Sequence, residues 1–283
     1  MYYGIVIISV LMFGIQFYFN DNYQKESGTG ASSVFVSTFV GAVVGVLFLA
    51  VINRFDFSLT PFALAWSFIT AINSVLCSIC SLKALEKVNL SVYSLFTMLG
   101  GMMLPFIAGL AFYNESMTVA KAICVAFVTS ALLITINWKK KTGGELYYFG
   151  IFILNGMSGV LSKIYESAEL SKVSSGGYSL WVSVMSAAIS LIALIIIGKR
   201  VVPSFRAILF SAGGGILNRI ANFLLLISLA VLPASVQYPF VTGGVIIVST
   251  AIAALTKRKP AKKEIWAVCL SFTGILALVL IPI

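Results

Sequence analysis

The chain contains no histidine and only nine acidic residues, and charged residues make up 10% of its 283 positions. A soluble globular protein carries roughly a quarter of charged residues, so this composition excludes an ordinary soluble domain. Hydrophobic residues account for 60% of the chain, and its mean hydropathy is +1.04. We therefore expect a protein embedded in a lipid bilayer.

The absence of histidine also removes most catalytic and metal-binding arrangements. A Ser-His-Asp triad cannot form, and no paired-carboxylate arrangement stands out in the apolar runs or the loops. All four cysteines lie in apolar runs, where Cys77 and Cys80 form a C-x-x-C one helical turn apart. A zinc site would need further ligands nearby, so packing is the favoured interpretation of this pair. We expect no enzyme activity, no metal and no cofactor.

A net charge of +10 is compatible at first sight with nucleic-acid binding. The basic residues, however, lie in short loops between apolar runs, where they act as topology signals rather than as a phosphate-binding face. The first apolar run lacks a basic segment before it and a small-residue cleavage site, so we predict a membrane helix and not a signal peptide. The expected partners are the bilayer and a small-molecule substrate, and nucleic acid is not expected.

Apolar runs of about 20 residues suit the hydrocarbon core of a bilayer, which is roughly 30 Å thick. Ten runs are predicted to be transmembrane helices: residues 2–20, 30–52, 61–82, 90–112, 118–137, 147–166, 177–198, 207–231, 235–256 and 264–283. Asp21-Asn22 is expected to end the first helix, Pro61 to open the third and Thr118 to cap the fifth. The predicted fold class is an all-α polytopic membrane protein.

The first half of the chain matches the second when it is shifted forward by 143 to 146 residues. Corresponding pairs include Gly14 and Gly159, Asn73 and Asn218, Gly100-Gly101 and Gly243-Gly244, and Cys124 and Cys269. Matches in the same order at a nearly constant offset indicate a duplication. We predict one five-helix repeat over 1–137, a basic linker over 138–146 and a second repeat over 147–283. Because five is an odd number, the two repeats must lie in opposite orientations in the membrane.

Basic residues predict the orientation of the chain. Fourteen of the 19 lysines and arginines fall in loops after odd-numbered helices, and four fall on the other side: Arg54, Lys121, Lys163 and Lys172. Since positive charge is retained in the cytoplasm, we expect both termini to be extracytoplasmic in a multi-pass plasma-membrane protein. The oligomeric state is not fixed by the sequence, and a monomer is favoured. Gly41 and Gly45 permit close helix contact within or between chains.

Several short motifs resemble those of a known transporter family. Ser91 follows a short loop and leads into an apolar helix that contains Pro105 and ends at the turn Tyr113-Asn114-Glu115. Pro233-Ala234-Ser235 opens the corresponding helix of the second half, whose own acidic turn is replaced by Lys257-Arg258-Lys259. With these features the chain resembles, over essentially its whole length, the EamA-type ten-helix carriers of the drug/metabolite transporter superfamily. In that family's turn a glycine precedes the glutamate, and here Asn114 takes its place.

The resemblance implies a central cavity lined mainly by the first, third, fourth, sixth, eighth and ninth helices. It also implies that the fifth and tenth helices pack at the ends of the two repeats. Transport would occur by alternating access, in which the two repeats rock around the cavity.

Arg219 is the only charged residue deep inside a predicted helix, twelve residues from either end of the 207–231 run. A charge at the bilayer centre costs at least about 2.5–3.5 kcal/mol, so we expect it to face the protein interior or water and to have a partner. No acidic residue lies at a similar depth, so a guanidinium here is suited to the anionic group of a substrate. A structural role, in which Arg219 binds backbone carbonyls, explains the same pattern.

Asparagines supply most of the other intramembrane polar groups. Asn218 and Asn222 are four residues apart and share a helix face, and Asn73 corresponds to Asn218 in the first repeat. Asn73 also lies on one helical stripe with Trp66. These residues are candidates for binding the polar groups of a ligand. Interhelical hydrogen bonds, worth under about 2 kcal/mol each, are the alternative explanation.

The remaining candidate substrate-binding residues are Tyr93, Gln237, Tyr238, Gln16 and Asn155. An aromatic residue facing a cavity can stack on a ligand or close a gate, whereas an interfacial aromatic belt explains most tyrosines of membrane proteins. Lys163 and Glu166 are predicted to pair with each other, because they are three residues apart on one helix. Glu115 is predicted to cap a helical hairpin rather than to carry protons.

Together these patterns predict a secondary-active or facilitative exporter of a small carboxylate-bearing metabolite, such as an amino acid. Without histidine or a central carboxylate there is no obvious proton relay. One alternative is a carrier of small organic cations, in which Trp66 and Tyr93 make cation–π contacts. The other is a membrane scaffold that transports nothing.

Overall fold

The computed structural model describes residues 2–28, 30–87, 90–135, 145–198, 203–255 and 262–281, and these residues form helices and no strand. The helices are α1 (Tyr2–Ser27), α2 (Ala31–Ile52), α3 (Pro61–Lys87), α4 (Leu90–Phe112), α5 (Val119–Thr135), α6 (Glu145–Ser167), α7 (Ser175–Ile197), α8 (Phe205–Leu229), α9 (Ala234–Leu255) and α10 (Lys262–Leu280). Among them, α1, α2, α7, α8 and α10, together with 61–80 of α3 and 234–252 of α9, are long and apolar enough to cross a membrane. Residues 138–144 of the predicted linker, 138–146, lie outside the described residues.

The first predicted helix end is wrong. Asp21-Asn22 does not break α1, because the side chain of Asn22 donates to the carbonyl of Tyr18 and the helix continues to Ser27. The helix ends at Gly28, whose φ of 72° is left-handed and whose N–H donates to the Gln24 carbonyl at 2.9 Å. A glycine that adopts this conformation after the last turn commonly ends a helix. Because the glycine follows the polar residues 20–27, these residues still belong to α1.

Two other predicted boundaries are confirmed. α3 begins at Pro61, where the missing N–H costs least. Thr118 precedes α5, and its hydroxyl oxygen accepts a long hydrogen bond of 3.4 Å from the N–H of Lys121. Serines cap α7 and α8 in the same way, since the hydroxyls of Ser174 and Ser204 each accept an N–H at 3.1 Å.

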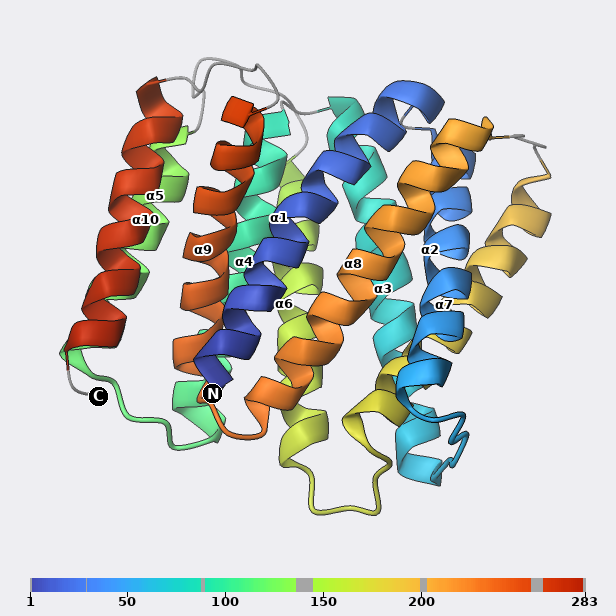
Figure 1. The fold of residues 1–283 in the computed structure, drawn as a ribbon, viewed down its shortest axis with the longest axis horizontal. Helices are drawn as coiled ribbons and strands as arrows, with labels where there is room; N and C mark the ends of the chain where they lie inside the picture. The colour runs from blue at the N-terminus through green and yellow to red at the C-terminus, as the bar shows by residue number, and fades with distance from the viewer. Residues whose placement is uncertain are drawn as a thin grey trace.

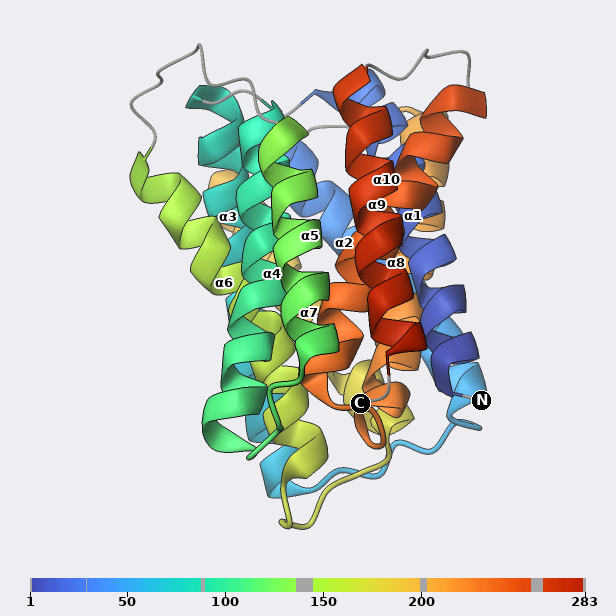
Figure 2. The same ribbon diagram turned by 90° about the vertical axis from the view of Figure 1, so that its left-hand side faces the viewer.

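Helices from the first half of the chain pack mainly on helices from the second half. α1 contacts α8 and α9, and α6 contacts α3 and α4. α2 contacts α7 and α8, and α7 contacts α2 and α3. α5 and α10 pack on each other along one flank of the bundle (Figures 1 and 2). The two halves are therefore interleaved, and neither forms a separate bundle.

The contact between α2 and α8 is built from small residues. The hydroxyl of Ser211 donates to the carbonyl of Ser37, 174 residues away, at 3.1 Å. One turn further along both helices, the backbones at Gly41 and Gly215 approach so closely that a Cβ on Gly41 would lie 3.1 Å from the Gly215 Cα. The close helix contact expected of Gly41 thus occurs within the chain.

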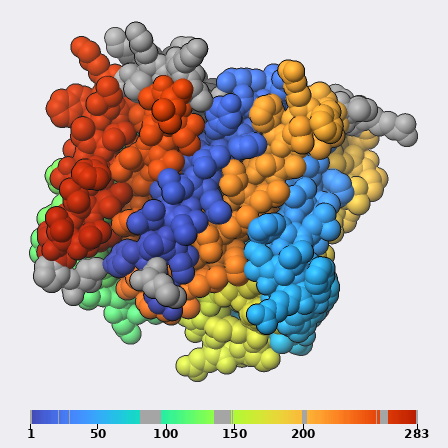
Figure 3. Space-filling model, in the orientation of Figure 1, coloured from blue at the N-terminus to red at the C-terminus, as the bar shows by residue number. Residues whose placement is uncertain are grey.

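The outer surface of the bundle is apolar. Leu47, Phe112, Ile196 and Phe205 are each more than half exposed, and α1 and α8 lie side by side across the face shown in Figure 3. The largest buried apolar cluster joins α1, α4, α5, α8, α9 and α10 through residues such as Val10, Met102 and Val128. Apolar side chains therefore fill the core and also lie on the outer surface.

Candidate functional site

Arg219 lies near the middle of α8, and its side chain is half-buried. Its stem packs on α2, because a Cβ at Gly45 would come within 2.7 Å of the Arg219 Cγ. In the described part of the chain the guanidinium has neither an ion pair nor a hydrogen bond. The native partner expected from the sequence is therefore not found among these residues.

Asn73 and Trp66 both bind the backbone of α6. The amide nitrogen of Asn73 donates to the carbonyl of Leu154 and to the hydroxyl of Ser158, each at 2.9 Å. The indole nitrogen of Trp66 donates to the carbonyl of Leu161 at 2.9 Å, and its ring stacks on Phe62. Both side chains thus connect α3 to α6, and their N–H groups already have hydrogen-bond acceptors.

Asn218 on α8 binds a side chain of α1. Its amide nitrogen donates to the side-chain oxygen of Gln16, on α1, at 3.2 Å. Asn222 is exposed, and its amide nitrogen donates to the carbonyl of Asn218 one turn earlier at 2.8 Å. Asn218 and Gln16 therefore connect α8 to α1, next to Arg219 in sequence.

Three further candidates also form interhelical hydrogen bonds. Asn155 on α6 donates to the carbonyl of Thr97 on α4 at 2.7 Å, and the hydroxyl of Tyr238 on α9 donates to the carbonyl of Gly159 on α6 at 3.1 Å. Gln237 is buried and donates to the Leu225 carbonyl, while its own side-chain oxygen accepts from Ser228 at 2.6 Å. The side chain of Tyr93 lies outside the described residues.

A cluster that sequence reasoning did not assemble surrounds Glu115, in the turn between α4 and α5. Its carboxylate accepts the N–H groups of Ala234 and Ser235 at 2.9 Å each and the Ser235 hydroxyl at 2.5 Å. The same carboxylate lies 3.2 Å from the Nζ of Lys163 on α6. The expected capping role is therefore seen, but the capped helix is α9 of the second half and not the α4–α5 hairpin.

Burial alone would raise the pKa of Glu115, but hydrogen bonds from the Ser235 hydroxyl and from the Ser235 and Ala234 N–H groups, together with the charge of Lys163, outweigh it. The pKa of this carboxyl is therefore lowered from its ordinary value. Both Tyr113-Asn114-Glu115 and Pro233-Ala234-Ser235 were visible as motifs. Their contact was not predictable, because about 120 residues separate them.

The predicted pair of Lys163 and Glu166 is wrong. Lys163 pairs with Glu115 and lies over the Tyr113 ring, with its Nζ 5.3 Å from the ring centroid. Glu166 accepts the Ser175 hydroxyl at 2.6 Å and lies 4.0 Å from Lys172. The spacing along α6 predicted an ion pair between Lys163 and Glu166. In the structure each of these residues instead binds a partner on a neighbouring segment.

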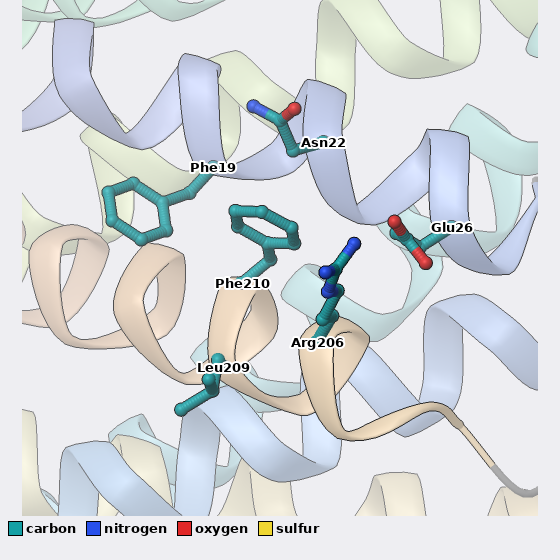
Figure 4. A pocket seen from close by; sticks show the side chains of 6 residues that line it. All are labelled: Phe19, Asn22, Glu26, Arg206, Leu209 and Phe210. Carbon is teal, nitrogen blue, oxygen red and sulfur yellow. The ribbon is translucent and has the colours of Figure 1, made fainter.

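At the opposite end of the bundle a recess of about 430 Å³ lies between α1 and α8 (Figure 4). Glu26 and Arg206 stand on its walls without forming an ion pair, and its other lining residues are Phe19, Asn22, Leu209 and Phe210. It lies near the ends of the two helices rather than beside Arg219. No candidate substrate-binding residue lines it.

No protein-family model and no curated protein matches the chain. Among solved structures, 29 chains match it. One, described as "Crystal structure of protein", covers 98% of this chain and 95% of its own length, with a TM-score of 0.79 and 14% identity. Similarity at this level of identity shows a shared fold and nothing about function.

Proposed function

We propose that the chain is a membrane transporter built from ten transmembrane helices in two inverted five-helix repeats, α1–α5 and α6–α10. The contacts support this division, because α1 packs on α8 and α9 as α6 packs on α3 and α4. α1 and α6 also run in opposite directions along the bundle (Figure 1). An odd number of helices in each repeat requires this inversion.

Residues matched by the sequence offset occupy equivalent contacts, which also supports the proposal. Gly14 of α1 lies against Val248 of α9, and its counterpart Gly159 of α6 lies against Pro105 of α4. The side-chain amide of Asn73 binds α6, and its counterpart Asn218 binds α1. A duplicated sequence that folds with internal two-fold symmetry accounts for these paired contacts.

The proposed class of substrate is inferred from Arg219. An unpaired guanidinium in a membrane-spanning helix is costly, and an anion from solution would supply the missing partner. Arg219 is only partly buried, so protein atoms do not enclose its side chain completely. Because a guanidinium binds a carboxylate through two parallel hydrogen bonds, we assign the substrate to small carboxylate-bearing metabolites such as amino acids.

The proposed transporter is an EamA-type carrier of the plasma membrane that exports its substrate by alternating access. Its orientation rests on the basic residues. Lys25, Arg206, Lys262 and Lys263 lie at the end of the bundle where α1 ends and α8 begins, whereas Lys121 and Lys163 lie near the opposite end (Figure 1). The first of these ends is assigned to the cytoplasm, so both termini are extracytoplasmic.

The cation-carrier alternative gains no support from Trp66. Its indole N–H is hydrogen-bonded to Leu161, and its ring stacks on Phe62 with 5.6 Å between centroids. A cation–π site requires a ring face that is open to the ligand.

Counterflow into proteoliposomes tests the proposed function. Vesicles that contain the purified chain are loaded with an unlabelled amino acid or an unlabelled quaternary amine, and the labelled form of the loaded solute is supplied outside. We expect accumulation of carboxylate-bearing solutes that Arg219→Ala lowers at least tenfold and that Arg206→Ala, on the same helix, leaves unchanged. Accumulation of quaternary amines alone would contradict the assignment of an anionic substrate, and no accumulation across a broad metabolite panel would contradict transport.

A further inference from the structure

Glu115 connects the two halves of the chain at the end of the bundle where α1 begins and α10 ends. It belongs to the turn that follows α4, whereas its partners Ala234, Ser235 and Lys163 belong to α9 and α6. The side chains of Glu115 and Lys163 are 8% and 11% exposed, so both charges are largely removed from water. These contacts hold a turn of the first repeat against two helices of the second.

The local sequence around Glu115 accommodates this carboxylate. A Cβ at Gly109 would come within 2.6 Å of the Glu115 Oε2, so any larger residue there would require the carboxylate to shift. Asn114 has a φ of 51°, in the left-handed region, which turns the chain so that the N–H of Glu115 donates to the Gly109 carbonyl at 3.2 Å. The turn therefore presents the carboxylate to the start of α9.

The chemistry of these contacts makes them strong. The first N–H groups of a helix have no partner within it, and a carboxylate placed there satisfies them and interacts favourably with the helix dipole. Removing the carboxylate would take away the hydrogen-bond acceptor of the Ala234 and Ser235 N–H groups. It would also take away the negatively charged partner of the buried Lys163 ammonium. Separation of the two halves at this point breaks the same contacts.

The second half has no acidic residue at the corresponding position of its sequence. Its corresponding turn reads Lys257-Arg258-Lys259, and the next acidic residue along the chain is Glu264. Two further hydrogen bonds join the halves at the Glu115 end: Ser174 donates to Asn53 at 3.0 Å, and Trp181 donates to the Ser58 carbonyl at 3.1 Å.

We propose that Glu115 is a latch that keeps the end of the bundle bearing the termini closed, and that opening this end requires the carboxylate to release Ala234, Ser235 and Lys163. This inference rests on the proposed alternating-access function, in which each end must open in turn. With the termini outside, the latch favours the state that is closed to the exterior. Substrate binding must then supply the free energy that releases it.

The latch does not require proton uptake. The titratable groups facing Glu115 are Lys163 on α6, Lys121 on α5 and Tyr113 in its own turn. Its hydrogen bonds and Lys163 keep the pKa of Glu115 below its ordinary value, so it is ionised near neutral pH. Release is therefore a conformational step rather than a titration.

Distances between spin labels in the full chain in lipid nanodiscs test the latch. Labels at Met117→Cys and Val231→Cys, both 56% exposed, report the separation of the α4–α5 turn from the start of α9. The four native cysteines are replaced so that only these positions react. Glu115→Gln, Glu115→Ala and Ser235→Ala are compared with Glu166→Gln, which removes a carboxylate that binds only within the second half.

We expect a single short-distance population in the parent and in Glu166→Gln. In Glu115→Ala the ratio of long to short distances should rise roughly tenfold or more, the factor expected for loss of one charge-assisted hydrogen bond. Ser235→Ala keeps the carboxylate and the backbone contacts, so it should give a smaller rise, and it provides the readout if the Glu115 variants do not fold. Distance distributions of folded variants that match those of Glu166→Gln would overturn the latch.

The same measurement separates this inference from the proposed function. Label distances report opening whether or not a solute crosses the membrane. If Glu115→Ala opens but the parent transports no solute, the latch is supported and the proposed transport function is contradicted. If the distances are unchanged and the parent transports carboxylates, only the latch is contradicted.

Discussion

Gly45 of α2 lies against the side chain of Arg219 on α8, and a Cβ at residue 45 would come within 2.7 Å of the Arg219 Cγ. One turn earlier, Gly41 faces Gly215, and one turn before that, Ser37 accepts a hydrogen bond from Ser211. α2 and α8 therefore run in the same direction, and small residues line their contact. At the last of these positions, Gly45 leaves room for the side chain of Arg219. The position of the guanidinium depends on this glycine.

Gly45→Val should displace Arg219 and weaken substrate binding. The added side chain overlaps the arginine stem close to its root, where the stem has little freedom to move away, so the guanidinium shifts within the proposed site. We expect the apparent affinity for the carboxylate substrate to fall about tenfold, which corresponds to about 1.4 kcal/mol. Counterflow at several substrate concentrations measures it.

Gly41→Ala is the matched control for this effect. Its added Cβ would lie 3.1 Å from the Gly215 Cα and does not reach Arg219, so it perturbs the same helix pair without touching the guanidinium. It should lower the unfolding temperature while leaving the substrate affinity of the folded protein unchanged. Equal losses of affinity in both variants would show that α2–α8 packing, and not the arginine, is what matters.

Asn73→Ala should destabilise the protein more than Asn222→Ala. Asn73 connects α3 to α6 through two hydrogen bonds, whereas exposed Asn222 binds a carbonyl of its own helix. Interhelical hydrogen bonds in membranes contribute about 0.6 kcal/mol on average and up to about 1.7. Unfolding midpoints in detergent measure both variants. A larger loss for Asn222→Ala would contradict the structural role assigned to Asn73.

Asn114 tests the turn that precedes Glu115. Its left-handed φ of 51° costs a branched residue roughly 1–2 kcal/mol, whereas glycine adopts it freely. Asn114→Gly should therefore leave the unfolding temperature nearly unchanged, and Asn114→Val should lower it. Similar unfolding temperatures for the two variants would argue against this backbone conformation.

The helices were predictable from the sequence, but their partners were not. Apolar runs bounded by Pro61 and Thr118 gave helix starts close to those observed, since hydrophobic length and capping residues act locally. The end of α1 was missed because Gly28, seven residues beyond Asp21, provides the stop. At the candidate site, neighbours in space come from opposite halves of the chain. Nothing in the sequence near Asn73 or Glu115 indicates Leu154 or Ser235 as the partner.

Acid should weaken the contact made by Glu115. Its pKa is lowered in the folded protein from an ordinary value of 4.5, so its ionised form contributes stability that is complete above about pH 4.5. That contribution is lost as the pH falls through the folded-state pKa. The unfolding temperature of the parent should therefore fall more steeply on acidification than that of Glu115→Gln. Parallel pH profiles for the two proteins would contradict the lowered pKa.

The most direct test of the account measures binding to Arg219 itself. Isothermal titration of the purified protein with a carboxylate solute identified by counterflow compares the parent with Arg219→Ala, Arg219→Lys and Arg206→Ala. We expect full affinity in Arg206→Ala and at least a tenfold loss in Arg219→Ala. Arg219→Lys should have an intermediate affinity, because lysine keeps the charge but cannot form two parallel hydrogen bonds. A folded Arg219→Ala protein that binds the solute as tightly as the parent would contradict the account.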